Sequence, residues 1–264
     1  MTDSTARARW RIPAPAGGWG PPWPQVTELV SVFPGDLWTL VGGLMIQIHA
    51  VHANLPIHRA TIDIDMVLHI ETGATTFGQA RYALESVGYE LRLPDTRKAP
   101  VHRFLRGHQQ VDVMIADHLA PSRRPTVAGH EVFRIPAGTS ALRKTVNCDI
   151  EVSDGQTITV SVPNVLGALV LKGAAYLEDP RDRDRHLDDA ALLACAIANP
   201  RAYAREMSGS DSRRVQSLVT QLRDPLHRSW LAVPPELRER ARDALIATVR
   251  APHGQPPVRR LGER

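Results

Sequence analysis

The chain has 264 residues, which is enough for one large or two small domains. Its hydrophobic content of 43% is ordinary for a globular protein. It contains no run of about 18 apolar residues, so we expect no membrane-spanning helix. The formal net charge is +4, but residues 201–264 carry 13 arginines against 7 acidic residues, a net +6 in this part alone. The two cysteines, Cys148 and Cys195, lie in apolar surroundings, and we expect free thiols in a cytoplasmic protein.

The two ends of the chain lack a core-forming pattern. Residues 1–24 are rich in proline, glycine and alanine, with three tryptophans interspersed, and they predict a flexible N-terminal arm. Residues 251–264 have a similar composition and predict a flexible tail.

Between residues 25 and 162, short apolar runs alternate with helical patterns. This alternation predicts a core of mixed strands and helices. The strands are expected at 37–41, 62–70, 89–93, 101–105, 111–115, 131–135 and 157–162. The helices are expected at 44–53, which places His49 and His52 on a helix surface, and at 76–87.

From residue 163 to 250 the apolar spacing is helical. Helices are expected at 163–177, 188–198, 201–223 and 235–250. The sequence therefore predicts an α+β protein, in which a mixed β-sheet core with flanking helices is followed by a C-terminal helical bundle.

Two aspartates stand at positions i and i+2 of one predicted strand. Asp63 and Asp65 alternate with Ile62, Ile64 and Met66, so both carboxylates point to the same face. A plain polar strand face would give the same pattern. However, two neighbouring carboxylates repel each other, and the arrangement becomes favourable when a divalent cation takes oxygen ligands from both.

A third aspartate and a glycine pair extend this pattern. Asp112 lies between Val111 and Val113 in another predicted strand, so pairing of the two strands would bring three carboxylates together. Gly42 and Gly43 end the apolar run before the first predicted helix, where glycine permits a tight turn and the close approach of a ligand. Together these residues predict a Mg²⁺-dependent phosphate-transfer site.

The order of these motifs resembles the polymerase-β-type nucleotidyltransferase superfamily. Gly-Gly is followed by Arg-x-Thr-x-Asp-x-Asp and by a later hydrophobic-Asp-hydrophobic strand. Within that superfamily the chain is similar to the AbiEii/MenT-like toxin branch, over about residues 37–195. The resemblance implies a nucleotidyltransferase-like core, Mg²⁺ as cofactor and an NTP as substrate.

The resemblance also implies roles for individual residues. Asp63, Asp65 and Asp112 would bind the metal, and Asp112 would also accept the proton of the attacking hydroxyl. Nucleotide contacts are implied for residues that flank these carboxylates or follow them: Gly42, Gly43, Arg59, Thr61 and Lys172. Thr61 stands where the branch usually has serine. Structural pairing is an alternative role for Arg59, and Arg103, on the strand before Asp112, is a further candidate for facing the nucleotide.

The stretch 185–189 departs from the family pattern. Arginine replaces a lysine there, and His186 replaces the first aspartate. Asp189 falls at the second acidic position and is a catalytic candidate that could orient Lys172, with Asp188 as the alternative assignment. Lys172 is one of only three lysines in the chain, which favours a functional role in holding the triphosphate.

Three interpretations of the acceptor remain open. Resemblance to the toxin branch implies a tRNA 3′ end or another RNA, and a cognate antitoxin as partner. A small-molecule nucleotidyltransferase of the aminoglycoside type shares Gly-Gly and Asp-x-Asp, but it needs an acidic pocket, against which the basic C-terminal third argues. A non-catalytic RNA-binding module is the third possibility, and the intact set of three aspartates argues against it.

Overall fold

The computed structural model describes residues 7–57, 59–96, 98–153 and 155–250. The chain divides into two compact units, Met1–Leu171 and Lys172–Arg264, which we describe separately. The sequence analysis places this boundary earlier, at residue 163. The predicted tail at 251–264 and the first six residues of the predicted arm lie outside the described residues.

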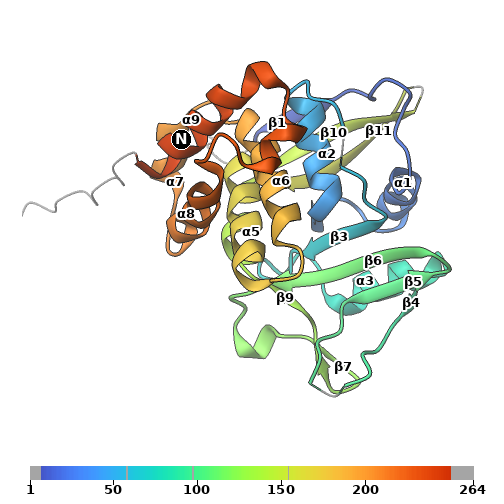
Figure 1. The fold of residues 1–264 in the computed structure, drawn as a ribbon. Coiled ribbons are helices and arrows are strands. Elements are labelled where there is room, and N and C mark those ends of the chain that lie inside the picture. The colour runs from blue at the N-terminus through green and yellow to red at the C-terminus, as the bar shows by residue number, and fades with distance from the viewer. Residues whose placement is uncertain (1–6, 58, 97, 154, 251–264) are drawn as a thin grey trace, which may run out of the picture. The chain divides into compact units, whose positions relative to one another are not determined.

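A mixed sheet dominates the described part of the first unit (Figure 1). Its nine strands run in the order β1-β10-β11-β2-β3-β6-β5-β4, with β9 beside β6. The strands are β1 (Arg9–Ile12), β2 (Trp38–Val41), β3 (Asp63–Leu68), β4 (Glu90–Leu91), β5 (Arg103–Arg106), β6 (Gln109–Ala116), β9 (Arg134–Ile135), β10 (Thr145–Ser153) and β11 (Gln156–Pro163). The predicted mixed sheet is thus confirmed.

Several helices belong to the same unit. They are α1 (Trp23–Val32), α2 (Gly42–His52), α3 (Phe77–Ser86), α4 (Gly138–Leu142) and the 3₁₀ turn Pro121–Arg123. At the start of α3, Thr76 and Gln79 form a capping box in which each side chain accepts a hydrogen bond from the other's backbone amide. Helix α5 (Val165–Glu178) contains the division between the two units.

Helix α2 is buried on nearly every side because it packs against β1, β2 and β3. This burial corrects the interpretation of His49 as a helix-surface residue, since its side chain is 0% exposed. The His49 Nε2 lies 3.0 Å from the Pro163 carbonyl oxygen, which can only accept, so Nε2 carries the proton and donates.

The described part of the predicted N-terminal arm is tied into the first unit, which corrects the expectation of a flexible segment. Strand β1 pairs in parallel with β10, with Trp10 opposite Cys148. The Trp10 ring stacks on His52 at 4.0 Å, and the indole of Trp19 donates to the Glu151 carbonyl at 2.7 Å. The aromatic residues therefore anchor a segment whose proline and glycine content hides its strand.

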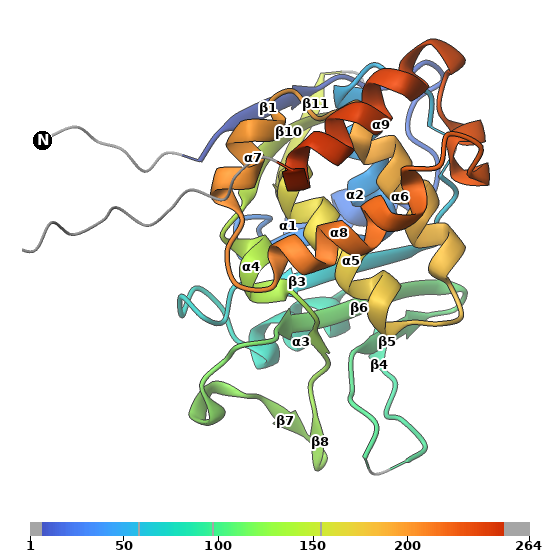
Figure 2. The same ribbon diagram turned by 60° about the vertical axis from the view of Figure 1, so that its left-hand side comes forward.

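Two predicted elements are interrupted in the structure. The strand expected at 131–135 is split between β9 and β8 (His130–Glu131), which forms a two-stranded ribbon with β7 (Thr126–Val127). In both views this ribbon is drawn below β6 (Figures 1 and 2). The helix expected at 201–223 is two helices, because Gly209 takes a positive φ of 56° between them.

Every described element after Leu171 is helical. The second unit contains the end of α5, α6 (Arg183–Cys195), α7 (Pro200–Glu206), α8 (Asp211–Leu222), the 3₁₀ helix Arg228–Ala232 and α9 (Pro235–Arg250). Helix α9 contacts α6, α7 and α8, and Trp230 is buried with its indole nitrogen donating to the Leu222 carbonyl. Among the described helices, none combines the length and the apolar character that crossing a membrane requires.

Candidate metal centre

The strand register places four positions in one row across the middle of the sheet. Val41 of β2 pairs with Asp65 of β3, Asp65 pairs with Asp112 of β6, and Asp112 pairs with Arg103 of β5. Residues that face each other directly on neighbouring strands project their side chains to the same face. The sheet itself therefore holds Asp65, Asp112 and Arg103 side by side.

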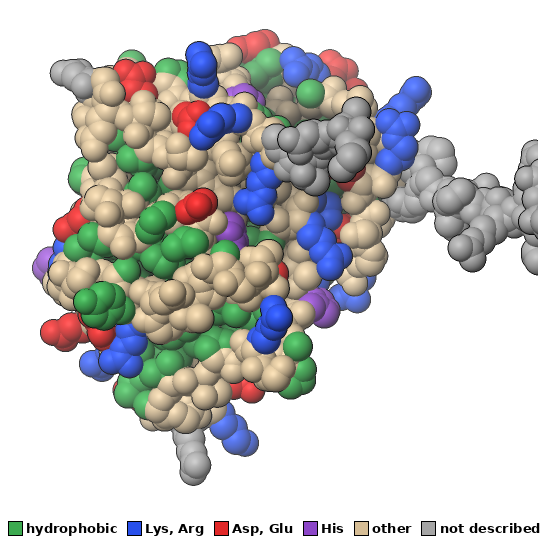
Figure 3. All heavy atoms as spheres, turned by 180° about the vertical axis from the view of Figure 1, so that it is seen from behind, with side chains coloured by type: hydrophobic (Ala, Val, Ile, Leu, Met, Phe, Trp, Pro, Cys, Tyr) green, Lys and Arg blue, Asp and Glu red, His purple; other side chains and the backbone are tan. Residues whose placement is uncertain are grey.

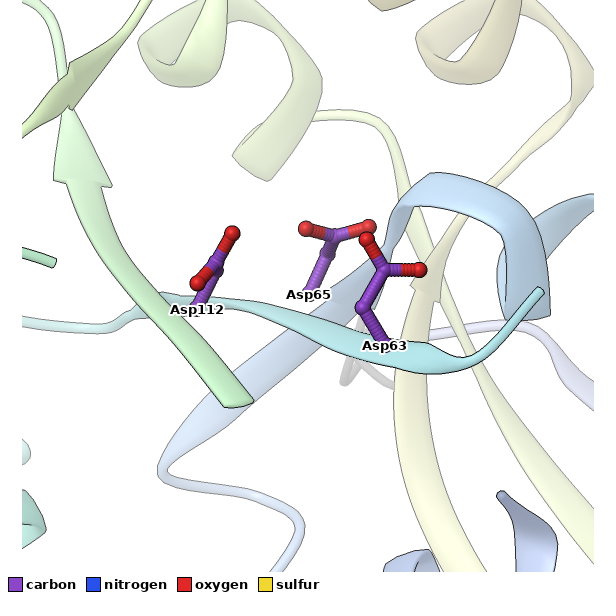
Figure 4. Close-up of side chains that lie close together, drawn as sticks. All are labelled: Asp63, Asp65 and Asp112. Atoms are coloured by element: carbon purple, nitrogen blue, oxygen red, sulfur yellow. The ribbon is translucent and has the colours of Figure 1, made fainter. Parts of the chain in front are cut away.

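Asp63 lies on the same face of the sheet, opposite Gln110, because it stands two residues before Asp65 on β3. One carboxylate oxygen from each of Asp63, Asp65 and Asp112 lies within 4.8 Å of the others. Figure 4 shows the three side chains rising from β3 and β6 on the same side of the sheet. The pairing of β3 with β6 that the sequence analysis expected is thus present, and it is parallel.

The donor set fits a divalent cation. All three ligands are carboxylate oxygens, which hard cations such as Mg²⁺ prefer. Asp112 is buried, whereas Asp63 and Asp65 are half-buried, so the cluster remains open to solvent on one side, as substrate access requires. Three carboxylates this close repel each other unless a positive charge compensates them.

Gly42 and Gly43 form the wall of this centre next to β3. Gly42 begins α2 directly after β2 with a positive φ of 67°, and a Cβ atom there would lie 1.8 Å from Asp65 Oδ2. A Cβ atom at Gly43 would lie 2.6 Å from Thr61 Oγ1. Gly42 is therefore needed for the turn and for the space that Asp65 occupies, and Gly43 is needed for the space that Thr61 occupies.

Thr61 forms a hydrogen bond with the Asp63 carboxylate in this structure. Its hydroxyl donates to Asp63 Oδ1 at 2.6 Å, and the residue is buried. The hydrogen bond fixes the orientation of the Asp63 carboxylate. Its predicted contact with the nucleotide stays a prediction.

Asp112 accepts three side-chain hydrogen bonds. Arg103 donates from Nε to Oδ1 at 3.0 Å and from Nη2 to Oδ2 at 2.9 Å, and the Gln110 side chain donates to Oδ2 at 3.1 Å. The His102 Nε2 lies 3.9 Å from Oδ2. Gln110 was not anticipated, although it stands two residues before Asp112 on the same strand face, which is a usable signal.

The Arg103 guanidinium lies in the field of all three carboxylates. Its hydrogen bond to Asp112 raises the pKa of Arg103 above the ordinary value for arginine, and the charges of Asp112, Asp63 and Asp65 act in the same direction against partial burial. Arg103 thus supplies positive charge to the cluster.

Arg59 lies on the loop that leads into β3. Its Nη1 donates to the Ala60 carbonyl, and its own carbonyl accepts a hydrogen bond from the Gln47 side chain at 2.7 Å. Gln47 in turn accepts from the Trp23 indole at 2.7 Å. The backbone at Arg59 is therefore fixed by α1 and α2, whereas the predicted contact of its side chain with the nucleotide stays a prediction.

In the second unit, the structure brings Lys172 and Asp189 together. The Lys172 Nζ lies 2.7 Å from Asp189 Oδ2, and the side chains are 8% and 2% exposed. The alternative residue, Asp188, is more exposed and lies 3.7 Å from Arg228 Nη2. Burial, followed by the charge of Lys172, lowers the pKa of the neighbouring His186.

Comparisons with known proteins add one structural likeness. No protein-family model matches the chain, and no curated protein matches it. The chain is similar to a solved structure described as an antigenic nucleotidyltransferase-like protein from Paracoccidioides brasiliensis, with 15% identity and a TM-score of 0.47. The match covers 85% of this chain and 93% of that one. At this identity and TM-score, the likeness carries no argument for the function.

Proposed function

We propose that this protein is a Mg²⁺-dependent nucleotidyltransferase that moves a nucleoside monophosphate from an NTP to an acceptor. The observation that carries the proposal is the convergence of Asp63, Asp65 and Asp112 beside the Gly42-Gly43 turn. Three carboxylate oxygens within 4.8 Å on an open sheet face form a ligand set for a cation that also binds phosphates.

In the proposed reaction, an acceptor hydroxyl oxygen forms a bond to the α-phosphorus of the NTP. The bond from that phosphorus to the bridging oxygen breaks, and pyrophosphate leaves. Asp63, Asp65 and Asp112 would hold the cation, and Asp112 would also accept the proton of the attacking hydroxyl. Bound Mg²⁺ supplies neutralisation of the phosphate charge and orients the triphosphate.

The surrounding residues position these groups. Thr61 keeps the Asp63 carboxylate in one orientation. The Gly42-Gly43 turn places the start of α2 next to Asp65, and amides at a helix N-terminus favour an anion such as a phosphate. By resemblance, Lys172 is proposed to bind the triphosphate, with Asp189 holding its ammonium group through the 2.7 Å ion pair.

For the acceptor we propose RNA, in particular a tRNA 3′ end, and the role of a toxin that a cognate antitoxin would restrain. The net charge of +6 over residues 201–264 supports an RNA acceptor, because phosphate contacts need basic side chains. On the face in Figure 3, basic side chains are interspersed with acidic ones, so the charge of that face does not define a path for RNA.

Incubation of the full chain with Mg²⁺, each labelled NTP in turn and total tRNA tests this proposal. Label is expected on RNA, and it should be lost in Asp65→Asn, which keeps the shape of the side chain beside Gly42. Metal and NTP binding without transfer to RNA would contradict the RNA acceptor and direct the search to small molecules such as aminoglycosides. Failure to bind either metal or NTP would overturn the proposed function itself.

A further inference from the structure

In this structure, Asp112 is bound by the guanidinium group of Arg103. Arg103 places its Nε and Nη2 on the two oxygens of Asp112 at 3.0 and 2.9 Å, in the fork geometry typical of arginine and a carboxylate. The two residues are direct partners in the antiparallel pairing of β5 and β6, so the sheet register places their side chains next to each other. Gln110 occupies a further lone pair of Oδ2.

The hydrogen bonds from Arg103 and Gln110 compete with the proposed roles of Asp112 in metal binding and proton acceptance. A carboxylate that shares a metal and accepts a proton needs lone pairs directed at the reacting groups. Here three of the roughly four lone-pair positions of the carboxylate already accept hydrogen bonds, two of them from a guanidinium. A bound divalent cation would also add positive charge beside Arg103, and like charges at such short range repel each other.

The Arg103 side chain is more accessible to an incoming ligand than the Asp112 side chain. The Arg103 side chain is 43% exposed, and the Asp112 side chain is 10% exposed. An arginine fork binds phosphate oxygens as well as it binds a carboxylate, and an incoming triphosphate brings several negative charges to this face. The guanidinium therefore has a second anionic partner of the same geometry once a nucleotide is bound.

We propose that the Arg103 guanidinium binds Asp112 while the metal is absent, and that it moves to the triphosphate when metal and nucleotide bind. This inference rests on the proposed function. It makes Arg103 a nucleotide-binding residue and orders the events, because the metal competes with Arg103 until a triphosphate is present to receive the guanidinium.

Calorimetry on the full chain tests the exchange with two probes, Mn²⁺ alone and each NTP with Ca²⁺. The variants are Arg103→Gln, which removes the charge, and Arg103→Lys, which keeps it without the fork. Arg81→Gln is a matched control, because Arg81 pairs with Glu85 on α3 and is 44% exposed. Near-UV circular dichroism checks that each variant is folded.

The expected result is opposite for the two probes. Without nucleotide, Arg103→Gln should bind Mn²⁺ about tenfold more tightly, since a charge-assisted competitor is gone. With Ca²⁺, it should bind the NTP about tenfold more weakly, since the phosphate contact is gone. Arg103→Lys should fall between Arg103→Gln and the wild type for both probes, and Arg81→Gln should match the wild type.

Three outcomes would overturn the exchange. Weaker Mn²⁺ binding in Arg103→Gln would show that Arg103 permanently orients Asp112. Unchanged NTP binding in that variant would show that the guanidinium never reaches the phosphates. A wild-type protein that binds neither probe would overturn the proposed function together with this inference, whereas the first two outcomes leave the proposed function intact.

Discussion

Gly42 and Asp65 are so close that a Cβ atom at position 42 would lie 1.8 Å from Asp65 Oδ2. The contact joins the first residue of α2 to a carboxylate of β3, the antiparallel neighbour of β2. A side chain at Gly42 would collide with the Asp65 carboxylate, so either Asp65 or the start of α2 would have to move.

Replacement of Gly42 by alanine should therefore damage both the fold and the metal centre. The φ of +67° alone costs about 1 kcal/mol for alanine, and the clash with Asp65 adds to it. We expect a lower melting temperature and a loss of Mg²⁺ binding. Thermal unfolding and Mg²⁺ titration measure the two effects.

Gly107→Ala is the matched control for this change. Gly107 has a similar φ of +60°, but nothing lies within 4 Å of a Cβ atom there. It should lose a similar amount of stability from backbone strain and keep its affinity for Mg²⁺. Equal Mg²⁺ affinity in the two variants would contradict the steric role of Gly42.

Thr61→Val should weaken metal binding without removing any ligand. The change deletes the hydroxyl that donates to Asp63 Oδ1 at 2.6 Å and leaves the shape of the side chain nearly the same. Residues that orient a metal ligand typically contribute about tenfold or more to affinity. We expect a drop of this size in Mn²⁺ affinity by calorimetry, and Thr61→Ser should restore most of it. A variant in which only NTP binding falls would instead support the phosphate contact predicted from the sequence.

The acidic cluster was largely predictable from sequence because its signals are local. Asp63 and Asp65 follow the period of a strand, and Asp112 sits in an equally clear apolar run. The side of the sheet that each residue faces follows from this period alone. What the pattern lacks is register, and the direct pairing of Asp65 with Asp112 therefore had to come from the structure.

Other features depend on contacts between distant segments and left no local signal. Strand β1 is stabilised by pairing with β10, about 140 residues later in the chain, so its proline-rich flanks suggested an arm. His49 and His52 lack nearby partners of a metal-ligand type in the sequence, so the pattern places His49 on a helix surface. The packing of α2 against β1, β2 and β3, and the hydrogen bond to the Pro163 carbonyl, show that it is buried. The fork from Arg103 to Asp112 likewise requires the register of a hairpin.

The pair of Lys172 and Asp189 provides a test that separates structural from functional roles. Because the side chains are only 8% and 2% exposed, Lys172→Met leaves a buried carboxylate without this cation and should cost about 3–5 kcal/mol of unfolding free energy. The double variant Lys172→Met/Asp189→Leu should recover most of that loss, as apolar replacements of buried ion pairs often do.

Activity of the double variant then distinguishes the two roles. If Lys172 binds the triphosphate, the double variant should be folded but inactive in the transfer assay. Arg228→Met is the control in the same unit, because its ion pair with Asp184 is exposed and should contribute less than about 1 kcal/mol. Full activity in the stable double variant would assign the pair a structural role alone.

His49 should make the fold sensitive to acid. Burial lowers the pKa of His49 from 6.5 to about 4, and its Nδ1 has no hydrogen-bond partner among the described residues, so a second proton there would be buried without an acceptor. The unfolded chain binds that proton below pH 6.5, whereas the folded chain resists it until about pH 4. The stability that neutral His49 supplies at pH 7 is therefore lost as the pH falls through this window, by about 3 kcal/mol in total.

His49→Gln should flatten this part of the pH profile, because glutamine keeps a donor for the Pro163 carbonyl but does not titrate. Urea unfolding between pH 7 and pH 4 measures the slope, and His108→Gln, at an exposed hairpin position, should leave it unchanged. The neighbouring His52, whose pKa burial also lowers, titrates in the same direction and remains in both variants, so the difference between their profiles isolates His49. An identical loss of stability in His49→Gln and the wild type would show that other groups, and not this buried imidazole, set the acid limit of the fold.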